Sequence, residues 1–185
     1  AKNLGITTLD SDTSNYGLSL ALGSAEVPLE EMANAYAAFA NNGQQYDTST
    51  IVQIDDKFGK TVFTEEHESE QAVSQQGAYL ISNILSDATT RSKIFGTSLT
   101  VSGNHTVAVK TGTTNDNRDA WAIGYNPQYV VGVWVGNNDN AEMQSGGSDM
   151  AGPIFKATMT NLLDGKENVQ FNVPSGIVQK AVCTG

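Results

Sequence analysis

Three stretches of the chain carry apolar residues at steps of three and four, the spacing that gathers them on one face of a helix. The first helix is expected to follow Pro28 and to end at Asn41-Asn42-Gly43. The second is expected from about Ser74 to Leu85, and the third from Gly152 until Gly165 stops it. The residues predicted to be buried are Leu29, Met32, Tyr36 and Phe39 on the first helix, Leu80, Ile81, Ile84 and Leu85 on the second, and Phe155, Met159, Leu162 and Leu163 on the third.

Shorter apolar runs rich in β-branched residues predict strands between these helices. Residues 51–54 and 61–63 flank a polar segment, which predicts a hairpin. Three further strands are expected at residues 107–113, 120–125 and 129–136. Their connections are short, so neighbouring strands should be antiparallel. The last strand is almost continuously apolar, which predicts that helices cover both faces of an antiparallel sheet in an α+β fold.

The composition is that of a globular protein, with 39% hydrophobic and 16% charged residues. Twenty acidic residues against ten basic ones give a net charge of −10, which argues against nucleic acid as a partner. Cys183 is the only cysteine, so no disulfide can form within the chain. His67 and His105 stand in no cluster with metal-ligand spacing, so we expect no metal site.

The chemistry-bearing candidate is Lys110-Thr111-Gly112-Thr113, at the end of a predicted strand. The lysine supplies a positive charge and three donors. The two threonines alternate along the strand and so present their hydroxyls on one side, and the glycine between them allows another backbone to approach. These properties suit an edge strand that receives an extended peptide and binds its terminal carboxylate. A lone Lys-Thr-Gly is common by chance, so its surroundings decide its meaning.

Four segments in order give the motif a specific setting. They are Tyr16–Gly23 with Glu26–Glu30, Ala35–Gly43, Lys110–Thr114 followed by Asp119-Ala120-Trp121, and Gly124–Pro127 leading to Val133–Asn137. In these segments the chain resembles the class A, bifunctional penicillin-binding proteins. Val109 stands where that family usually has glycine, and Ala122 where it usually has an aromatic residue. The resemblance implies that residues 1–165 are the C-terminal part of a transpeptidase domain and residues 166–185 a C-terminal extension.

Penicillin-binding proteins carry two further motifs, Ser-x-x-Lys and Ser-x-Asn. No serine stands three residues before any lysine of this chain, so the first motif is absent. Ser102-Gly103-Asn104 fits the second by pattern, but it lies only six residues before Lys110 and is interpreted as a turn. Gly59-Lys60-Thr61 lacks the earlier glycine of a phosphate-binding loop, so nucleotide binding is not expected. We expect the nucleophile to lie outside this chain.

The resemblance implies a peptidoglycan D,D-transpeptidase, which cross-links D-Ala-D-Ala stem peptides through a serine acyl-enzyme. Lys110 would be catalytic, shuttling a proton through the absent Ser-x-Asn serine. Lys110, Thr111, Gly112 and Thr113 would bind the substrate, and the backbone N–H of Thr113 would be one donor of the oxyanion hole. The implied partners are the peptidoglycan stem peptide, β-lactam antibiotics and the remainder of the same domain. Neither a metal nor an organic cofactor is expected.

The resemblance also implies a place on the extracytoplasmic face of the bacterial membrane, anchored through sequence outside this chain. Two alternatives stay open: a serine β-lactamase, which shares the three motifs, and a non-catalytic peptidoglycan-binding module. Residues 1–185 alone are expected to be inactive, because a chain without a nucleophile cannot be acylated. Trp121 and Trp134 lie on apolar strands and are predicted to belong to the core rather than to a sugar platform.

Overall fold

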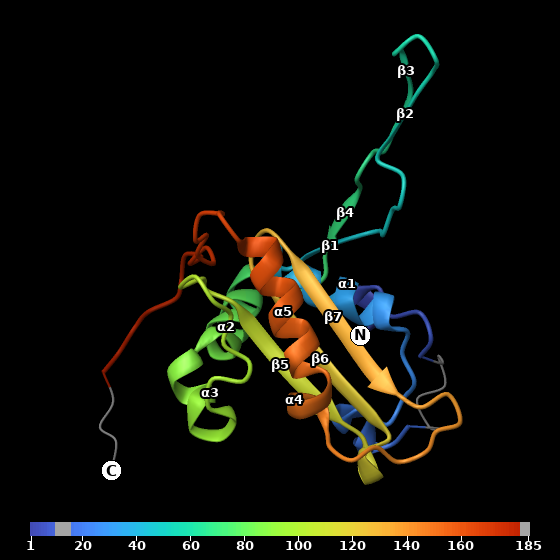
Figure 1. Ribbon diagram of the computed structural model, residues 1–185. Helices are drawn as coiled ribbons and strands as arrows, with labels where there is room; N and C mark the ends of the chain where they lie inside the picture. The colour runs from blue at the N-terminus through green and yellow to red at the C-terminus, as the bar shows by residue number, and fades with distance from the viewer. Residues whose placement is uncertain (10–15, 182–185) are drawn as a thin grey trace.

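The computed structural model describes residues 1–9 and 16–181, and Cys183 lies outside these ranges (Figure 1). Short 3₁₀ turns occur at Lys2–Leu4, Leu18–Leu22 and Asn115–Asn117. The helices of the described part are α1 (Leu29–Ala40), α2 (Gln75–Ser86), α3 (Ala88–Phe95), α4 (Gly147–Met150) and α5 (Gly152–Leu163). Its strands are β1 (Gln44–Tyr46), β2 (Gln53–Asp55), β3 (Thr61–Thr64), β4 (Ser69–Gln71), β5 (Ala108–Thr113), β6 (Asp119–Tyr125) and β7 (Val130–Gly136).

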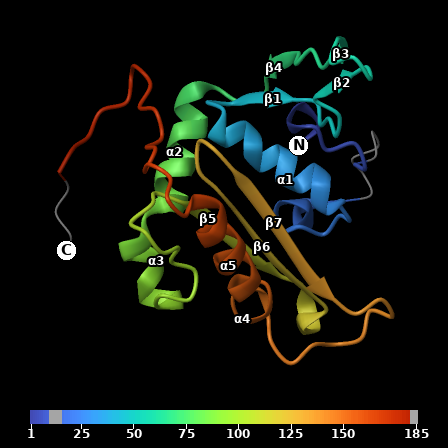
Figure 2. The same cartoon turned by 45° about the horizontal axis from the view of Figure 1, so that its top comes forward.

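The central sheet of the described residues is antiparallel, in the order β5-β6-β7, as the short connections predict. Helix α1 packs on one face and helix α5 on the other, so the prediction of an α+β fold with both faces covered is confirmed (Figure 2). Gly132 of β7 lies against Leu29 of α1. On the opposite face, Gly124 of β6 lies directly under the ring of Phe155 on α5. Glycines at these two points let the helices approach the sheet closely.

The main apolar core lies between the sheet and α5. Phe155, Met159 and Leu163 of α5 are fully buried, as predicted, whereas Leu162 is 37% exposed. Val109 belongs to the same core, so the residue that replaces the family's usual glycine packs well here. The core cluster also contains Val107, just before β5, and the strand residues Ala120, Ala122, Val131 and Val133.

The prediction that the apolar stripe of the second helix is buried is wrong. Helix α2 packs against β5 and α1, and its fully buried residues are the small Ala78 and Ser82. Leu80, Ile81 and Ile84 are 49%, 39% and 67% exposed. Small side chains at a four-residue spacing let a helix lie close to a sheet, and the larger residues then occupy neighbouring rows. The second helix therefore presents an apolar face that no described residue covers.

The expectation that both tryptophans belong to the core is also corrected. Trp134 is 38% exposed rather than buried, because its indole lies at the end of β7 and donates to an Asp119 carboxylate oxygen at 2.9 Å. Trp121 opposite it is half-buried. In the glycine-rich segment Ser145–Ser148, Gly147 is buried and begins helix α4. Sequence periodicity also missed α3, although Asp87 caps it by accepting from the Thr90 N–H at 2.9 Å.

Residues 44–71 form an arm that projects away from the rest of the molecule (Figure 1). Strands β1 and β4 pair at its base, and β2 and β3 form the predicted hairpin further out. Asp56 closes that hairpin by accepting from the backbone N–H groups of Phe58 and Lys60, at 2.8 and 3.0 Å. The hairpin is exposed on both sides, and its Phe58 is 83% exposed.

Residues 166–181 contain neither helix nor strand in the structure. This segment nevertheless contacts the body, by which we mean the central sheet and the helices packed on it. The ring of Phe171 packs edge-on against Tyr125, with 5.6 Å between ring centroids. Asn168 accepts from the Thr106 backbone N–H at 2.9 Å. The division of the chain at residue 165 stays a prediction. Within residues 1–9 and 16–181, no helix is long and apolar enough to cross a membrane.

Candidate functional site

The Lys-Thr-Gly segment occupies the last four positions of β5, which is an edge strand of the described sheet. Its register is set by β6, where Gly112 lies opposite Trp121. The backbone N–H of Thr114 donates to the Asp119 carbonyl at 3.1 Å. Because hydrogen bonding alternates along an antiparallel pair, Thr111 and Thr113 direct their backbone groups away from β6. The free edge of β5 therefore carries main-chain donors and acceptors that pair with no other strand of the described residues.

Lys110 is exposed, and no ion pair involves it in the described part of the chain. Its ammonium group donates to the carbonyl oxygen of Thr111, which faces the open edge. Strand alternation places Lys110 on the face opposite Thr111 and Thr113, but its long side chain folds back along the edge. The positive charge thus lies at the free edge of β5, where it is not neutralised by a carboxylate.

The two threonine hydroxyls differ in their surroundings. Thr113 accepts a hydrogen bond from the backbone N–H of Gly147 at 2.9 Å. Thr111 is half-buried, and within the described residues its hydroxyl makes no hydrogen bond. The sequence correctly places both hydroxyls on one face of the strand, but it gives no sign that α4 lies against one of them. The signal that could have found this contact is the Gly146-Gly147 pair, because glycines allow another backbone to approach closely.

A network of hydrogen bonds fixes the turn that follows Thr113. Thr114 donates from its hydroxyl to Asp119 Oδ2 at 3.0 Å, and accepts from the Asp119 backbone N–H at 2.7 Å. The other oxygen of Asp119 accepts from Trp134. Arg118 donates to the Asn140 carbonyl and so ties the turn to the segment after β7. These bonds hold the end of β5 in a fixed position relative to β6 and β7.

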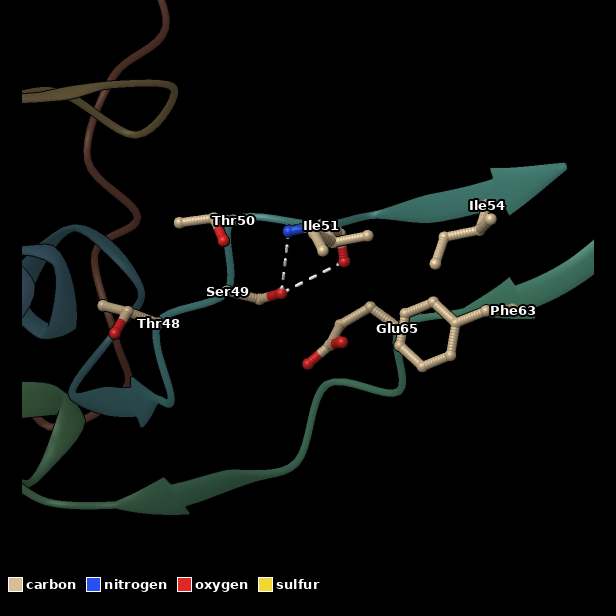
Figure 3. Close-up of a pocket in the computed structure, with 7 residues that line it drawn as sticks. All are labelled: Thr48, Ser49, Thr50, Ile51, Ile54, Phe63 and Glu65. Atoms are coloured by element: carbon tan, nitrogen blue, oxygen red, sulfur yellow. Dashed lines mark hydrogen bonds between the residues drawn. The ribbon is translucent and has the colours of Figure 1, made fainter.

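The described residues also form an open hollow on the arm, away from β5 (Figure 3). Its residues are Thr48, Ser49, Thr50, Ile51, Ile54, Phe63 and Glu65. The side chains of Ile54 and Phe63 pair across the hairpin, and Ser49 bonds only to the backbone of Ile51. The hollow brings together no pair of acid and base groups, so β5 remains the better candidate.

Comparison with known proteins identifies the family of the chain. The family model of the penicillin binding protein transpeptidase domain matches residues 2–160. Penicillin-binding protein 1A of Neisseria gonorrhoeae is 32% identical over 168 residues, covering 87% of this chain and 21% of that protein. The chain thus spans about a fifth of the length of that curated relative.

Solved structures show the same fold. Penicillin-binding protein 1A from Haemophilus influenzae superposes with a TM-score of 0.81 at 23% identity, covering 99% of this chain and 33% of that one. PonA1 from Mycobacterium tuberculosis in complex with penicillin V superposes with a TM-score of 0.80 at 24% identity, covering 95% of this chain and 51% of that one. The chain belongs to the penicillin-binding protein transpeptidase family, and the resemblance to its class A members is confirmed.

Proposed function

We propose that this chain supplies the substrate-carboxylate and oxyanion half of a peptidoglycan D,D-transpeptidase site. The observation that carries the proposal is the free edge of β5, where the Lys110 ammonium makes no ion pair among the described residues and the main-chain groups of Thr111 and Thr113 face outward. An extended stem peptide can add to such an edge as a further strand. Membership of the transpeptidase family supports the same reaction.

The reaction is an acyl transfer in two steps. A serine hydroxyl outside this chain attacks the carbonyl carbon between the two D-Ala residues. The new C–O bond forms, the peptide C–N bond breaks, and the terminal D-Ala leaves after its nitrogen takes up a proton. An amine of a neighbouring stem then attacks the ester and regenerates the serine. A β-lactam follows the first step only, because its ring-opened amine stays attached to the acyl group.

Each residue of the motif has a distinct proposed role. Lys110 helps to move the proton through the serine of the Ser-x-Asn motif, and its charge attracts the substrate carboxylate. The hydroxyls of Thr111 and Thr113 donate to that carboxylate. The backbone N–H of Thr113, which faces the free edge, stabilises the oxyanion of the tetrahedral intermediate. One such donor is worth about 2.7–4 kcal/mol in comparable sites.

The rest of the site must come from sequence outside residues 1–185, because Ser-x-x-Lys is absent. Helix α2 packs beside β5 and leaves Leu80 and Ile84 exposed. We propose that the remainder of the transpeptidase domain covers this face and brings the nucleophile to β5. Anchoring at the extracytoplasmic face of the bacterial membrane, through sequence outside this chain, is part of the same proposal.

The test uses the intact protein that contains this chain. A fluorescent penicillin should label it, and the label should persist, because the acyl-enzyme forms readily and hydrolyses slowly. Mixed with a D-Ala-D-Ala peptide and an amine acceptor, the protein should release D-Ala and form the new amide. Rapid turnover of a chromogenic β-lactam would instead identify a β-lactamase. Absence of both labelling and turnover would support a binding module and contradict the proposal.

A further inference from the structure

The start of helix α4 lies directly against the end of β5. The backbone N–H of Gly147 donates to the hydroxyl oxygen of Thr113 at 2.9 Å, although the two residues are 34 positions apart. Helix α4 contacts both β5 and β6. The residue that follows the helix, Ala151, is fully buried, and its packing holds α4 in place against the sheet.

Both glycines at this contact are required by space rather than by backbone conformation. A Cβ atom on Gly147 would lie 2.4 Å from the Gly112 carbonyl oxygen and 2.8 Å from that of Trp121. A Cβ atom on Gly146 would lie 2.6 Å from the Thr113 hydroxyl oxygen. Gly146 has a φ of −99°, which any residue can adopt, and Gly147 is not in the left-handed region. Any side chain here would push α4 away from β5.

The bond from Gly147 fixes how the Thr113 hydroxyl can act. A threonine hydroxyl has one proton to donate and two lone pairs with which to accept. The Gly147 N–H occupies a lone pair and limits rotation of the group, so the proton remains available for a second partner. A carboxylate can only accept, which makes it a suitable partner for that proton.

We propose that Gly146 and Gly147 are positioning residues that set the Thr113 hydroxyl as a donor to the substrate carboxylate. This inference rests on the proposed function, because it concerns the same carboxylate. It goes further by assigning substrate selectivity to a segment that contacts the site through the backbone. Selectivity for a free carboxylate over a neutral group should then depend on these two glycines.

The experiment compares acylation rates of the intact protein by a penicillin and by its methyl ester, which lacks the carboxylate charge. The ratio of the two rates is the readout, because it does not change when a variant merely lowers the folded fraction. Gly147→Ala and Gly146→Ala should each reduce the ratio by about ten- to a hundredfold, the usual worth of a hydrogen bond to a charged group. The loss should fall on the penicillin, with the ester rate nearly unchanged.

Gly124→Ala is the matched control. A Cβ atom on Gly124 would lie 2.4 Å from the Phe155 ring and 2.8 Å from the Ala108 carbonyl oxygen, as crowded as at Gly147 but distant from Thr113. It should lower thermal stability and leave the ratio as in the wild type. Gly146→Ala is the second test variant if Gly147→Ala fails to fold, because the three atoms nearest to a Cβ on Gly146 all belong to the Thr113 side chain.

A second comparison uses a variant without the hydroxyl, Thr113→Val. In that background Gly147→Ala should reduce the ratio no further, because the donor that it positions is gone. A wild-type ratio in both glycine variants, or an equal further loss in the Thr113→Val background, would overturn the inference. If the wild-type protein is not acylated at all, the proposed function itself fails, and that result is distinct from either outcome.

Discussion

The central sheet and the arm are built from similar strand-forming residues, but they differ in what covers them. Val131 and Val133 of β7 are buried beneath α5, at 7% and 9% exposure. Val62 and Phe63 of the β2–β3 hairpin are 60% and 42% exposed. An apolar strand pattern thus predicts a strand, whereas burial of that strand requires a second layer packed on it. The sheet has helices on both faces, whereas no helix of the described residues packs on the β2–β3 hairpin.

The two regions should differ most in how much stability a phenylalanine contributes, which one substitution in each region measures. Phe155→Ala removes a fully buried ring that packs on β6, and should lower the free energy of unfolding by about 3–5 kcal/mol. Phe58→Ala, in the exposed hairpin turn, should change it by about 0.5 kcal/mol or less. Urea denaturation of the intact protein, followed by core fluorescence, measures both. Equal losses would contradict the division between body and arm.

The next effect concerns the buried hydroxyl pair on the α1 face of the sheet. Tyr125 and Ser82 are both fully buried, and their hydroxyl oxygens lie 3.1 Å apart. Tyr125→Phe leaves the serine hydroxyl without its partner and should cost about 1–3 kcal/mol. Adding Ser82→Ala removes that orphaned group and should restore part of the loss. A double variant that is less stable than Tyr125→Phe by the full cost of Ser82→Ala would contradict this coupling.

The same tyrosine makes the stability of the fold depend on pH in the alkaline range. Burial raises the pKa of Tyr125 from 10.0 to about 12, although the bond to Ser82 opposes the rise. The neutral phenol is thus favoured in the folded state, so its contribution is complete below pH 10 and is lost as pH rises toward 12. Stability measured across this window should fall more steeply for the wild type than for Tyr125→Phe. Parallel curves would argue against a buried phenol.

A smaller effect is expected when the arm is shortened. The backbone N–H of Glu65 donates to the Val52 carbonyl at 2.9 Å, so the outgoing and returning segments of the arm are hydrogen-bonded just below the hairpin. Replacing residues 53–64 with a two-residue Asn-Gly turn should leave the melting temperature of the body and its rate of penicillin labelling nearly unchanged. Loss of labelling would show that the arm supports the site, and would remove the distinction between the two regions.

The smallest effect is a loss of stability at acidic pH, and it involves Glu31 in the first turn of α1. The hydroxyl and backbone N–H of Thr7 donate to the Glu31 carboxylate at 2.5 and 2.9 Å, and these bonds lower the pKa of Glu31 below its usual 4.5. The contact therefore stabilises the fold above that pH and is lost as pH falls through the lowered pKa. Glu31→Gln should flatten the acid limb of the stability curve slightly. An unchanged limb would contradict the contribution.

The sequence predicted most elements because their patterns are local. Pro28 and Asn41 bound α1, and the short connection at Asn126-Pro127 joins two antiparallel strands as expected. The failures involve neighbours distant in sequence. Leu80 and Ile84 satisfy the helical spacing, but α2 buries Ala78 and Ser82 instead. Periodicity identifies an apolar stripe without showing which layer covers it.

The candidate site was predictable in part for the same reason. Lys110 and the two threonines form a contiguous motif, so their place on one strand follows from the sequence. The contact between Gly147 and Thr113 spans 34 positions and depends on the path of the chain after β7. The Asp119–Trp134 bond likewise joins two strands. Such tertiary contacts leave no periodic trace in the sequence.

The central claim is that the free edge of β5 binds and helps to activate the substrate through Lys110. Its most direct test is the rate of acylation of the intact protein by a fluorescent penicillin, comparing the wild type with Lys110→Ala. Lys93→Ala is the control, since Lys93 lies on α3 outside the proposed site. We predict that Lys110→Ala lowers the rate by at least about a hundredfold, on the scale of losing a transition-state donor, and that Lys93→Ala does not. Wild-type labelling of a folded Lys110→Ala protein would contradict the account.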